Sequence, residues 1–319
     1  MFKFISRTEN MPVGAIATCV GLGTLSAVYG NLGFMGARHL VMAAAILVWL
    51  GALVKLTRYR KTFAKDYSQV VPGSLYATFA MLTMIIGSYL FMFNQPFGKA
   101  LWLAGIILQV IHILVFSYRN LFRNLKMETF VPTWFVTYVG FLVSVTVGVE
   151  KGMPNLLLVI VYYGFVAYVI LFPFLVYRLI KYPLPPALSM TRAIFLAPNS
   201  LVLVGYLTVA GMPQHALEPN HPFVFAIYGL LFVTLFYVAW KLPAWLRAPF
   251  NPGFSALTFP TAIALVATNR MFNFLLNNGY ETLGNFLRGF FGVQLWVTTA
   301  LISYVAYGFL RLLFNSEKT

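Results

Sequence analysis

The chain has 319 residues, of which 60% are hydrophobic and 9% are charged. Soluble domains average about 25% charged residues, so this composition excludes a soluble protein and predicts an integral membrane protein. At about 20 residues for each membrane-spanning helix, the length accommodates about ten helices and leaves no sequence for a sizeable soluble domain. The net charge of +15 comes from 22 Lys and Arg residues scattered singly between apolar segments, a pattern typical of polytopic membrane proteins and not of nucleic-acid binding.

Ten apolar segments follow one another along the chain and predict ten membrane-spanning helices. We therefore predict an all-α integral membrane protein with one transmembrane domain over residues 1–319. Because the number of spans is even, the terminal segments 1–11 and 315–319 are expected on the same side of the membrane. The predicted spans are 12–30, 39–57, 71–93, 97–118, 130–149, 153–180, 193–212, 221–246, 253–276 and 285–314.

The connections between these segments differ in charge. Those on the side of the termini, together with the termini themselves, carry 17 Lys and Arg residues, and those on the opposite side carry five. Cytoplasmic loops are enriched in Lys and Arg, so both termini are predicted to be cytoplasmic. This orientation corresponds to a multi-pass protein of the plasma membrane, which in bacteria is the inner membrane.

A proline recurs near the start of each odd-numbered segment. The five prolines are separated by 60, 60, 66 and 62 residues. Periodic similarity indicates a repeated unit, here a hairpin of one odd and one even helix used five times. Proline kinks or breaks a helix, although in the first helical turn it is an ordinary starting residue. The predicted kink positions are Pro12, Pro72, Pro132, Pro198 and Pro260.

Small or hydroxyl-bearing residues follow these prolines, whereas the even segments are crowded with large apolar side chains. Small residues let helices approach closely, or leave open space where they face a cavity. We therefore predict that the five odd helices surround a central pore and that the five even helices face the lipid bilayer. The residues expected to line the pore are Gly14, Ala15, Gly73, Ser74, Thr133, Ser200, Thr261 and Ala262.

Phe259 is the only aromatic residue among the five that directly precede these prolines. The residue before a proline is disfavoured in the α conformation, so we expect Phe259 at a break in its helix. Broken helices occur at membrane depth only where protein or a water-filled cavity satisfies the freed backbone groups. An aromatic ring in a narrow apolar lumen excludes water, and Phe259 is therefore the predicted pore gate.

Charge inside the spans is scarce. All seven Asp and Glu residues fall in loops or at span ends, which disfavours a cation channel and a carboxylate-based proton pump and favours anions or neutral solutes. Arg270 lies eleven residues after Phe259, roughly 16 Å further along a helix. It is expected either to extend to the outer headgroups or to form an electropositive group at the outer mouth of the pore.

No pattern of a metal, nucleotide or nucleophile site is present, so the sequence predicts neither an enzyme nor a bound metal or cofactor. His112 is the only histidine at membrane depth. A single buried histidine is more often a hydrogen-bonded packing residue than a ligand, and haem ligation by two histidines needs a second one facing it.

Two stretches resemble a known family: RAIFLAPNSLVLVGYL, residues 192–207, and FSALTFPTAIALVATNRMF, residues 254–272. They are similar to segments of the tellurite-resistance/dicarboxylate transporter family, which includes bacterial TehA-type proteins and the plant slow anion channels. The resemblance implies a homotrimer in which the five odd helices of each protomer line a pore. It also implies that one phenylalanine blocks this pore, and the match in LTFPTA places it at Phe259. Members transport monovalent anions, dicarboxylates or sulfite, depending on the branch.

Three candidate functions are consistent with these observations, and the first is favoured. A passive pathway gated by Phe259 would carry small inorganic or organic anions, and would favour large, weakly hydrated ones because its lumen lacks a strong fixed charge. A proton-coupled carrier of a C4-dicarboxylate, sulfite or another oxyanion is the alternative, with His112 as a candidate proton carrier. A membrane enzyme or a quinone-binding subunit is the third.

Overall fold

The computed structural model describes residues 8–215 and 218–315. Over these ranges the chain forms helices and connecting turns without a β-strand. Eight helices in this part of the chain are long and apolar enough to cross a membrane. The prediction of an all-α membrane protein is thus confirmed. The expected span 130–149 is present as a shorter apolar stretch, Trp134–Thr146.

Five mostly buried segments alternate along the described chain with five long, mostly exposed helices. The exposed helices are α3 (Met35–Arg58), α7 (Gln95–Ser117), α10 (Pro154–Lys181), α12 (His221–Leu246) and α14 (Glu281–Asn315). The buried segments are α2 (Val13–Asn31), α5 and α6 (Val70–Leu75, Ala77–Phe91), α8, η3 and α9 (Trp134–Tyr138, Val139–Leu142, Val143–Thr146), η5 and α11 (Pro186–Phe195, Leu196–Ala210), and η6 and α13 (Pro252–Leu257, Thr258–Asn277).

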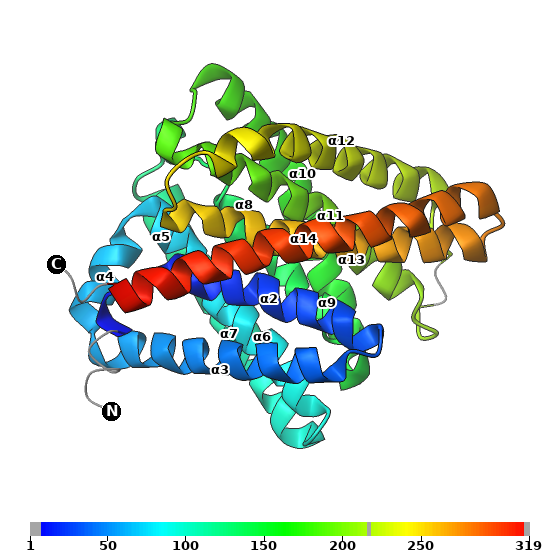
Figure 1. Ribbon diagram of the computed structural model, residues 1–319, viewed down its shortest axis with the longest axis horizontal. Helices are drawn as coiled ribbons and strands as arrows, with labels where there is room; N and C mark the ends of the chain where they lie inside the picture. Colours follow the sequence, from blue (N-terminus) through cyan, green and yellow to red (C-terminus); the bar gives the residue numbers. More distant parts are fainter. Residues whose placement is uncertain (1–7, 216–217, 316–319) are drawn as a thin grey trace.

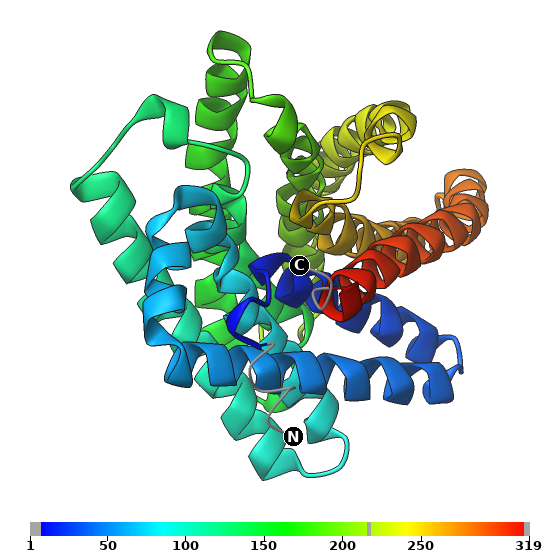
Figure 2. The same cartoon turned by 60° about the vertical axis from the view of Figure 1, so that its left-hand side comes forward.

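The buried segments contact one another in a closed order. α2 packs against α6 and α13, α13 packs against α11, α11 packs against η3 and α9, and η3 and α9 return to α6. The exposed helices pack on the outside of this group, α3 on α2, α7 on α6, α10 and α12 on α11, and α14 on α13. Figures 1 and 2 show the same order at the front of the molecule, where α2 (dark blue) lies between α3 (blue) and α14 (red).

Glycines allow α6 and α7 to pack closely in their hairpin. A β-carbon at Gly98 would lie 2.3 Å from the Phe91 nitrogen, and one at Gly87 would lie 2.5 Å from the Trp102 nitrogen. Any side chain at either position would collide with the opposite backbone. Small residues at helix contacts provide the close packing that holds helices together in a membrane, where lipid tails are as apolar as the side chains.

The five prolines all lie at or near the start of a helix. Pro12 and Pro132 precede α2 and α8, and Pro72 lies within the short α5. Pro198 and Pro260 are the third residues of α11 and α13. In the first turn a residue has no intrahelical acceptor for its N–H, so proline there removes no hydrogen bond.

The irregular backbone near Pro260 lies before the proline and not at it. The 3-10 helix η6 ends at Leu257, and α13 begins with Thr258. Phe259 is consequently the second residue of an α-helix, which corrects the expectation that it lies at the break itself. Phe259 therefore adopts the α conformation that a following proline disfavours, and the change from 3-10 to α geometry comes just before Thr258.

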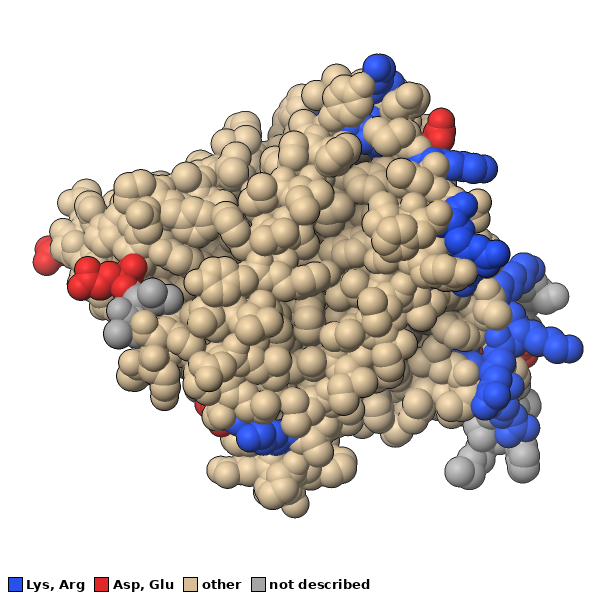
Figure 3. All heavy atoms as spheres, turned by 180° about the vertical axis from the view of Figure 1, so that it is seen from behind, with Lys and Arg blue, Asp and Glu red and all other residues tan. Residues whose placement is uncertain are grey.

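Most of the Lys and Arg residues visible in Figure 3 gather at one end of the molecule, the end at which α3 and α14 finish. Lys55 at this end is buried inside the fold. Its Nζ lies 2.6 Å from Asp66 Oδ2 in α4 (Arg60–Ser68) and donates to the Met11 carbonyl at 2.9 Å. The ion pair joins the end of α3 to α4, and the hydrogen bond joins it to Met11, the residue before Pro12.

Candidate functional site

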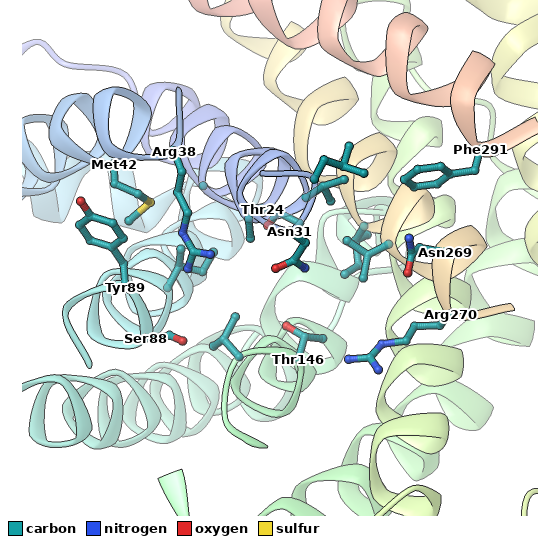
Figure 4. Close-up of a pocket in the computed structure, with 18 residues that line it drawn as sticks. Thr24, Asn31, Arg38, Met42, Ser88, Tyr89, Thr146, Asn269, Arg270 and Phe291 are labelled. Atoms are coloured by element: carbon teal, nitrogen blue, oxygen red, sulfur yellow. The ribbon is translucent and has the colours of Figure 1, made fainter. Parts of the chain in front are cut away.

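Two of the cavities in the described structure are lined mainly by the buried segments. The smaller, which we call the constriction, has a volume of about 30 Å³ and is lined by all five buried segments, including Phe259 and Pro260 of α13. The larger, which we call the vestibule, has a volume of about 350 Å³ and is shown in Figure 4. The constriction has room for about two water molecules and no more.

The constriction presents an apolar surface. Phe259 is 6% exposed and shares the cavity with small residues such as Ala17, Gly140 and Ala197. Its two hydroxyl-bearing neighbours are turned toward their own backbone: Thr78 donates to the Leu75 carbonyl at 2.6 Å, and Ser255 donates to the Pro252 carbonyl at 2.9 Å. An apolar surface of this kind offers water and ions few hydrogen-bond partners.

The backbone that carries Phe259 is in close contact with α2. A β-carbon at Gly21 would lie 2.8 Å from the Phe259 nitrogen. Beside it, Thr258 Oγ1 donates to the Ser255 carbonyl at 2.8 Å and is 3.4 Å from the Ala17 carbonyl of α2. The packing of α2 on α13 therefore fixes the backbone at the start of α13, to which the ring is attached.

The hydroxyl residues predicted to line a pore lie at helix contacts. Ser74 Oγ donates to Thr133 Oγ1 at 2.7 Å, a bond that joins α5 to the start of α8. Ser200 and Thr261 donate to carbonyls of their own helices, at 2.7 Å in each case, to Leu196 and Leu257. None of the four lines the constriction or the vestibule.

The other four predicted lining residues also lie away from both cavities. A β-carbon at Gly14 would be 2.8 Å from the Phe309 ring of α14, and one at Gly73 would be 2.8 Å from a backbone carbonyl of α4. These glycines are thus contact points between helices. Ala15 and Ala262 are buried in the core.

The vestibule is lined by α2, α3, α6, α9, α13 and α14. Arg270 and Asn269 of α13 line it, so the structure brings the predicted outer group to a cavity. Sequence reasoning missed Arg38 of α3, which lines the same space. In Figure 4 the two guanidinium groups reach toward the cavity from different sides. Arg38 lies near Tyr89, with its Cζ 5.9 Å from the ring centroid.

The two cavities lie in series along the same helices. On α13, Phe259 lines the constriction, and Arg270, eleven residues further on, lines the vestibule. On α6, Thr78 lines the first and Ser88 the second. Between the lining positions of α6 lies Leu82, which is fully buried. A packed apolar side chain on α6 therefore lies between the vestibule and the constriction.

His112 lies outside both cavities. Its Nδ1 is 3.1 Å from the Tyr67 hydroxyl, and its Nε2 is 3.2 Å from Thr137 Oγ1. With both ring nitrogens hydrogen-bonded and Phe116 stacked beside it, this histidine has the contacts of a packing residue.

A basic vestibule beside an apolar constriction affects anions in two ways. Clustered positive charge raises the local concentration of anions. An apolar constriction blocks them until it widens. Within the described ranges, neither cavity is lined by an Asp or Glu side chain that would attract cations.

Comparison with known proteins agrees with this chemistry. Residues 10–311, which run from before α2 into the last turns of α14, match the protein family described as voltage-dependent anion channel. A search of curated proteins gives no match. The family match covers nearly the whole chain and confirms the resemblance seen in the sequence. The chain therefore belongs to the voltage-dependent anion channel family, whose members are anion channels or transporters.

Proposed function

We propose that this protein is a passive pathway for small anions across the membrane and that the ring of Phe259 occludes it. The observation that carries the proposal is the position of Phe259 in a cavity lined by all five buried segments. Phe135 lines the same cavity, but its ring packs against Phe195 with the centroids 5.2 Å apart. Among the described residues, Phe259 has no such aromatic partner, so its ring is the freer of the two to move.

The proposal includes a specific architecture. The ten segments form five hairpins, with the odd members around the pore and the even members outside. The alternation of buried and exposed segments supports this arrangement, and so does the closed order of contacts among the buried ones. The basic end of the molecule would face the cytoplasm together with both termini.

The constriction would select anions by the cost of removing their water. It offers no fixed charge to replace the hydration shell, so weakly hydrated anions would pass more easily than strongly hydrated ones. The basic vestibule would supply anions to it. By family resemblance we propose a homotrimer with one pathway per protomer in the bacterial inner membrane, which native mass spectrometry of the purified protein tests.

The experiment compares Phe259→Ala with wild type and with Phe274→Ala in liposomes loaded with nitrate. Phe274 is a matched control because it is on the same helix and 7% exposed, against 6% for Phe259, but packs on His221 with the centroids 5.0 Å apart. We expect Phe259→Ala to raise efflux at least about tenfold, which corresponds to about 1.4 kcal/mol removed from the barrier. Equal efflux from all three proteins would refute the gate.

The same liposomes separate a passive pathway from a coupled carrier. In a passive pathway the net flux follows the anion's electrochemical gradient, and a pH gradient imposed at constant membrane potential does not drive net transport of the anion. Uptake of succinate or sulfite that a pH gradient drives would instead establish the proton-coupled carrier.

A further inference from the structure

We propose that Arg38 and Arg270 form a docking site for polyatomic oxyanions in the vestibule, separate from the constriction. The proposed role of this site in permeation rests on the proposed function, whereas the binding itself does not. The site would recognise oxyanions at the vestibule by the geometry of their oxygens, whereas the apolar constriction distinguishes anions by the cost of removing their water.

Both guanidinium groups are available to a ligand. Among the described residues, neither guanidinium forms a hydrogen bond or an ion pair. Arg38 lies beside the face of Tyr89 and within electrostatic range of the Glu150 carboxylate. Each presents five N–H donors in a planar fork. Two such groups lining one cavity leave more donors than the protein itself satisfies.

Amide and hydroxyl groups add to these donors. Asn269 Oδ1 accepts from Asn273 Nδ2 at 3.1 Å, an orientation that leaves the Asn269 amide N–H groups for the cavity. Ser88 Oγ accepts from Lys151 Nζ at 3.5 Å, so its own proton is available. In Figure 4, the Asn31 side chain also lies between the two arginines. Donors thus come from α2, α3, α6 and α13.

No carboxylate in the described part of the chain lines the vestibule to compete for these donors. The acid beside Lys151, Glu150, is 75% exposed and lies 4.0 Å from the Lys151 ammonium. A space rich in donors and lined by no acid fits an anion, because a bound cation would find only a few hydroxyl and carbonyl oxygens.

The geometry of the donors favours an oxyanion over a halide. A guanidinium fork donates two parallel hydrogen bonds to two oxygens of one planar group, whereas a spherical halide has no second acceptor atom to match the fork. The volume of about 350 Å³ falls within the range of small-molecule sites, at its lower end. These donors suit nitrate or a carboxylate, and Arg38 and Arg270 are the two charged groups that line the cavity.

The direction of Arg38 is built into the fold. Its Cδ would lie 2.7 Å from a β-carbon at Gly30, so the stem of the arginine passes directly over this glycine of α2. The Tyr89 hydroxyl in turn is 2.8 Å from His39 Nδ1. Glycine below the stem and a hydrogen-bonded ring beside the head hold the guanidinium toward the vestibule.

The test measures thermal unfolding of the purified protein as nitrate replaces chloride at constant ionic strength. We expect a saturable rise of about 2–4 °C in the unfolding midpoint of wild type, since a ligand that binds only the folded state stabilises it by mass action. The rise should disappear in Arg38→Gln and in Arg270→Gln. It should remain in Arg288→Gln, a matched control on α14 that is exposed and does not line the vestibule.

Lysine variants separate a true oxyanion site from general positive charge. Arg38→Lys and Arg270→Lys keep the charge but lose the fork, so the difference between nitrate and chloride should shrink while the response to total anion persists. An identical nitrate response in wild type, the glutamine variants and the lysine variants would overturn the proposal.

Flux measurements keep the two proposals apart. Nitrate binding that depends on the two arginines supports the docking site even if Phe259→Ala liposomes show no flux, in which case the proposed pathway fails. Flux through Phe259→Ala with no arginine-dependent nitrate response refutes the docking site and leaves the pathway standing.

Discussion

Gly21 and Phe259 occupy the same point of contact between α2 and α13. A β-carbon at residue 21 would lie 2.8 Å from the Phe259 nitrogen and equally close to the carbonyl carbon of Thr258. Because these neighbours are backbone atoms, they yield only if one helix moves. The first helix of the buried group therefore determines where the helix that carries Phe259 begins.

Gly21→Ala should destabilise the protein, because the added methyl group forces α2 away from α13. Overpacking of this kind costs about 1–3 kcal/mol. The unfolding midpoint in detergent should fall by a few degrees, and basal anion leak should change because Phe259 moves with its backbone. Gly229→Ala is the matched control, since nothing lies within 4 Å of the added carbon. Equal stability of the two variants would contradict the close contact.

Substitutions of Phe259 should raise the anion flux more, the smaller the new side chain is. The ring fills a space of about 30 Å³ together with its neighbours, so Phe259→Leu should give an intermediate efflux and Phe259→Ala the highest. Phe259→Trp should give no more than wild type. Efflux of nitrate from liposomes at fixed protein content measures the series. An order that does not correlate with size would show that the ring is not the obstruction.

Flux should decrease at alkaline pH through Lys151. Its side chain is fully buried, with Nζ 3.7 Å from the centroid of the Phe91 ring, and it contacts Ser88 at the edge of the vestibule. Burial lowers the pKa of Lys151, and the nearby Glu150 carboxylate partly opposes this shift. The ammonium therefore loses its charge at a lower pH than an ordinary lysine does.

Nitrate flux through Phe259→Ala measured against pH tests this expectation. Loss of one positive charge should lower flux by roughly fivefold or less, because a unit charge at about 4 Å contributes about 1 kcal/mol in water. Adding Lys151→Met should remove the pH dependence. Glu150→Gln should move the decrease to lower pH, since the group that opposes the shift is gone. An unchanged profile in both variants would exclude Lys151.

Asp66→Asn should lower stability. Lys55 is 4% exposed at its side chain and Asp66 is 32% exposed, so removing the carboxylate charge leaves a buried ammonium without its partner. We expect a loss of about 1–3 kcal/mol, seen as a lower unfolding midpoint. The double variant Lys55→Met with Asp66→Asn should lose less than the sum of the single variants, because it leaves no buried charge. Strict additivity would indicate that the two groups do not interact.

Hydropathy was sufficient to locate eight of the ten predicted spans as long apolar helices, and the predicted and observed ranges of α12, 221–246, coincide. Long apolar runs separated by charged turns leave little freedom in this respect. The alternation of buried and exposed helices could be predicted from composition, since small residues concentrate in segments that must pack on every side.

Which face of a buried helix meets a cavity could not be predicted from the sequence. A helix that is apolar on all sides has no polar stripe to indicate its direction, and each residue turns the helix by about 100°. Ser74 and Thr133, for example, are of the residue types expected along a pore, but their hydroxyl groups form a hydrogen bond with each other at a helix contact. Arg38 was counted among loop charges, although α3 begins at Met35 and turns that arginine toward the vestibule.

The 3-10 helix η6 has a mechanical consequence for the ring two residues beyond it. A 3-10 helix rises about 2.0 Å per residue with 3.0 residues per turn, whereas an α-helix rises about 1.5 Å with 3.6. Over the six residues Pro252–Leu257 this difference amounts to about 3 Å of height. Each residue rewound to α geometry would also rotate α13 by about 20° about the helix axis. The helix type of this one short segment thus affects both the position of the Phe259 ring along the helix axis and its direction about that axis.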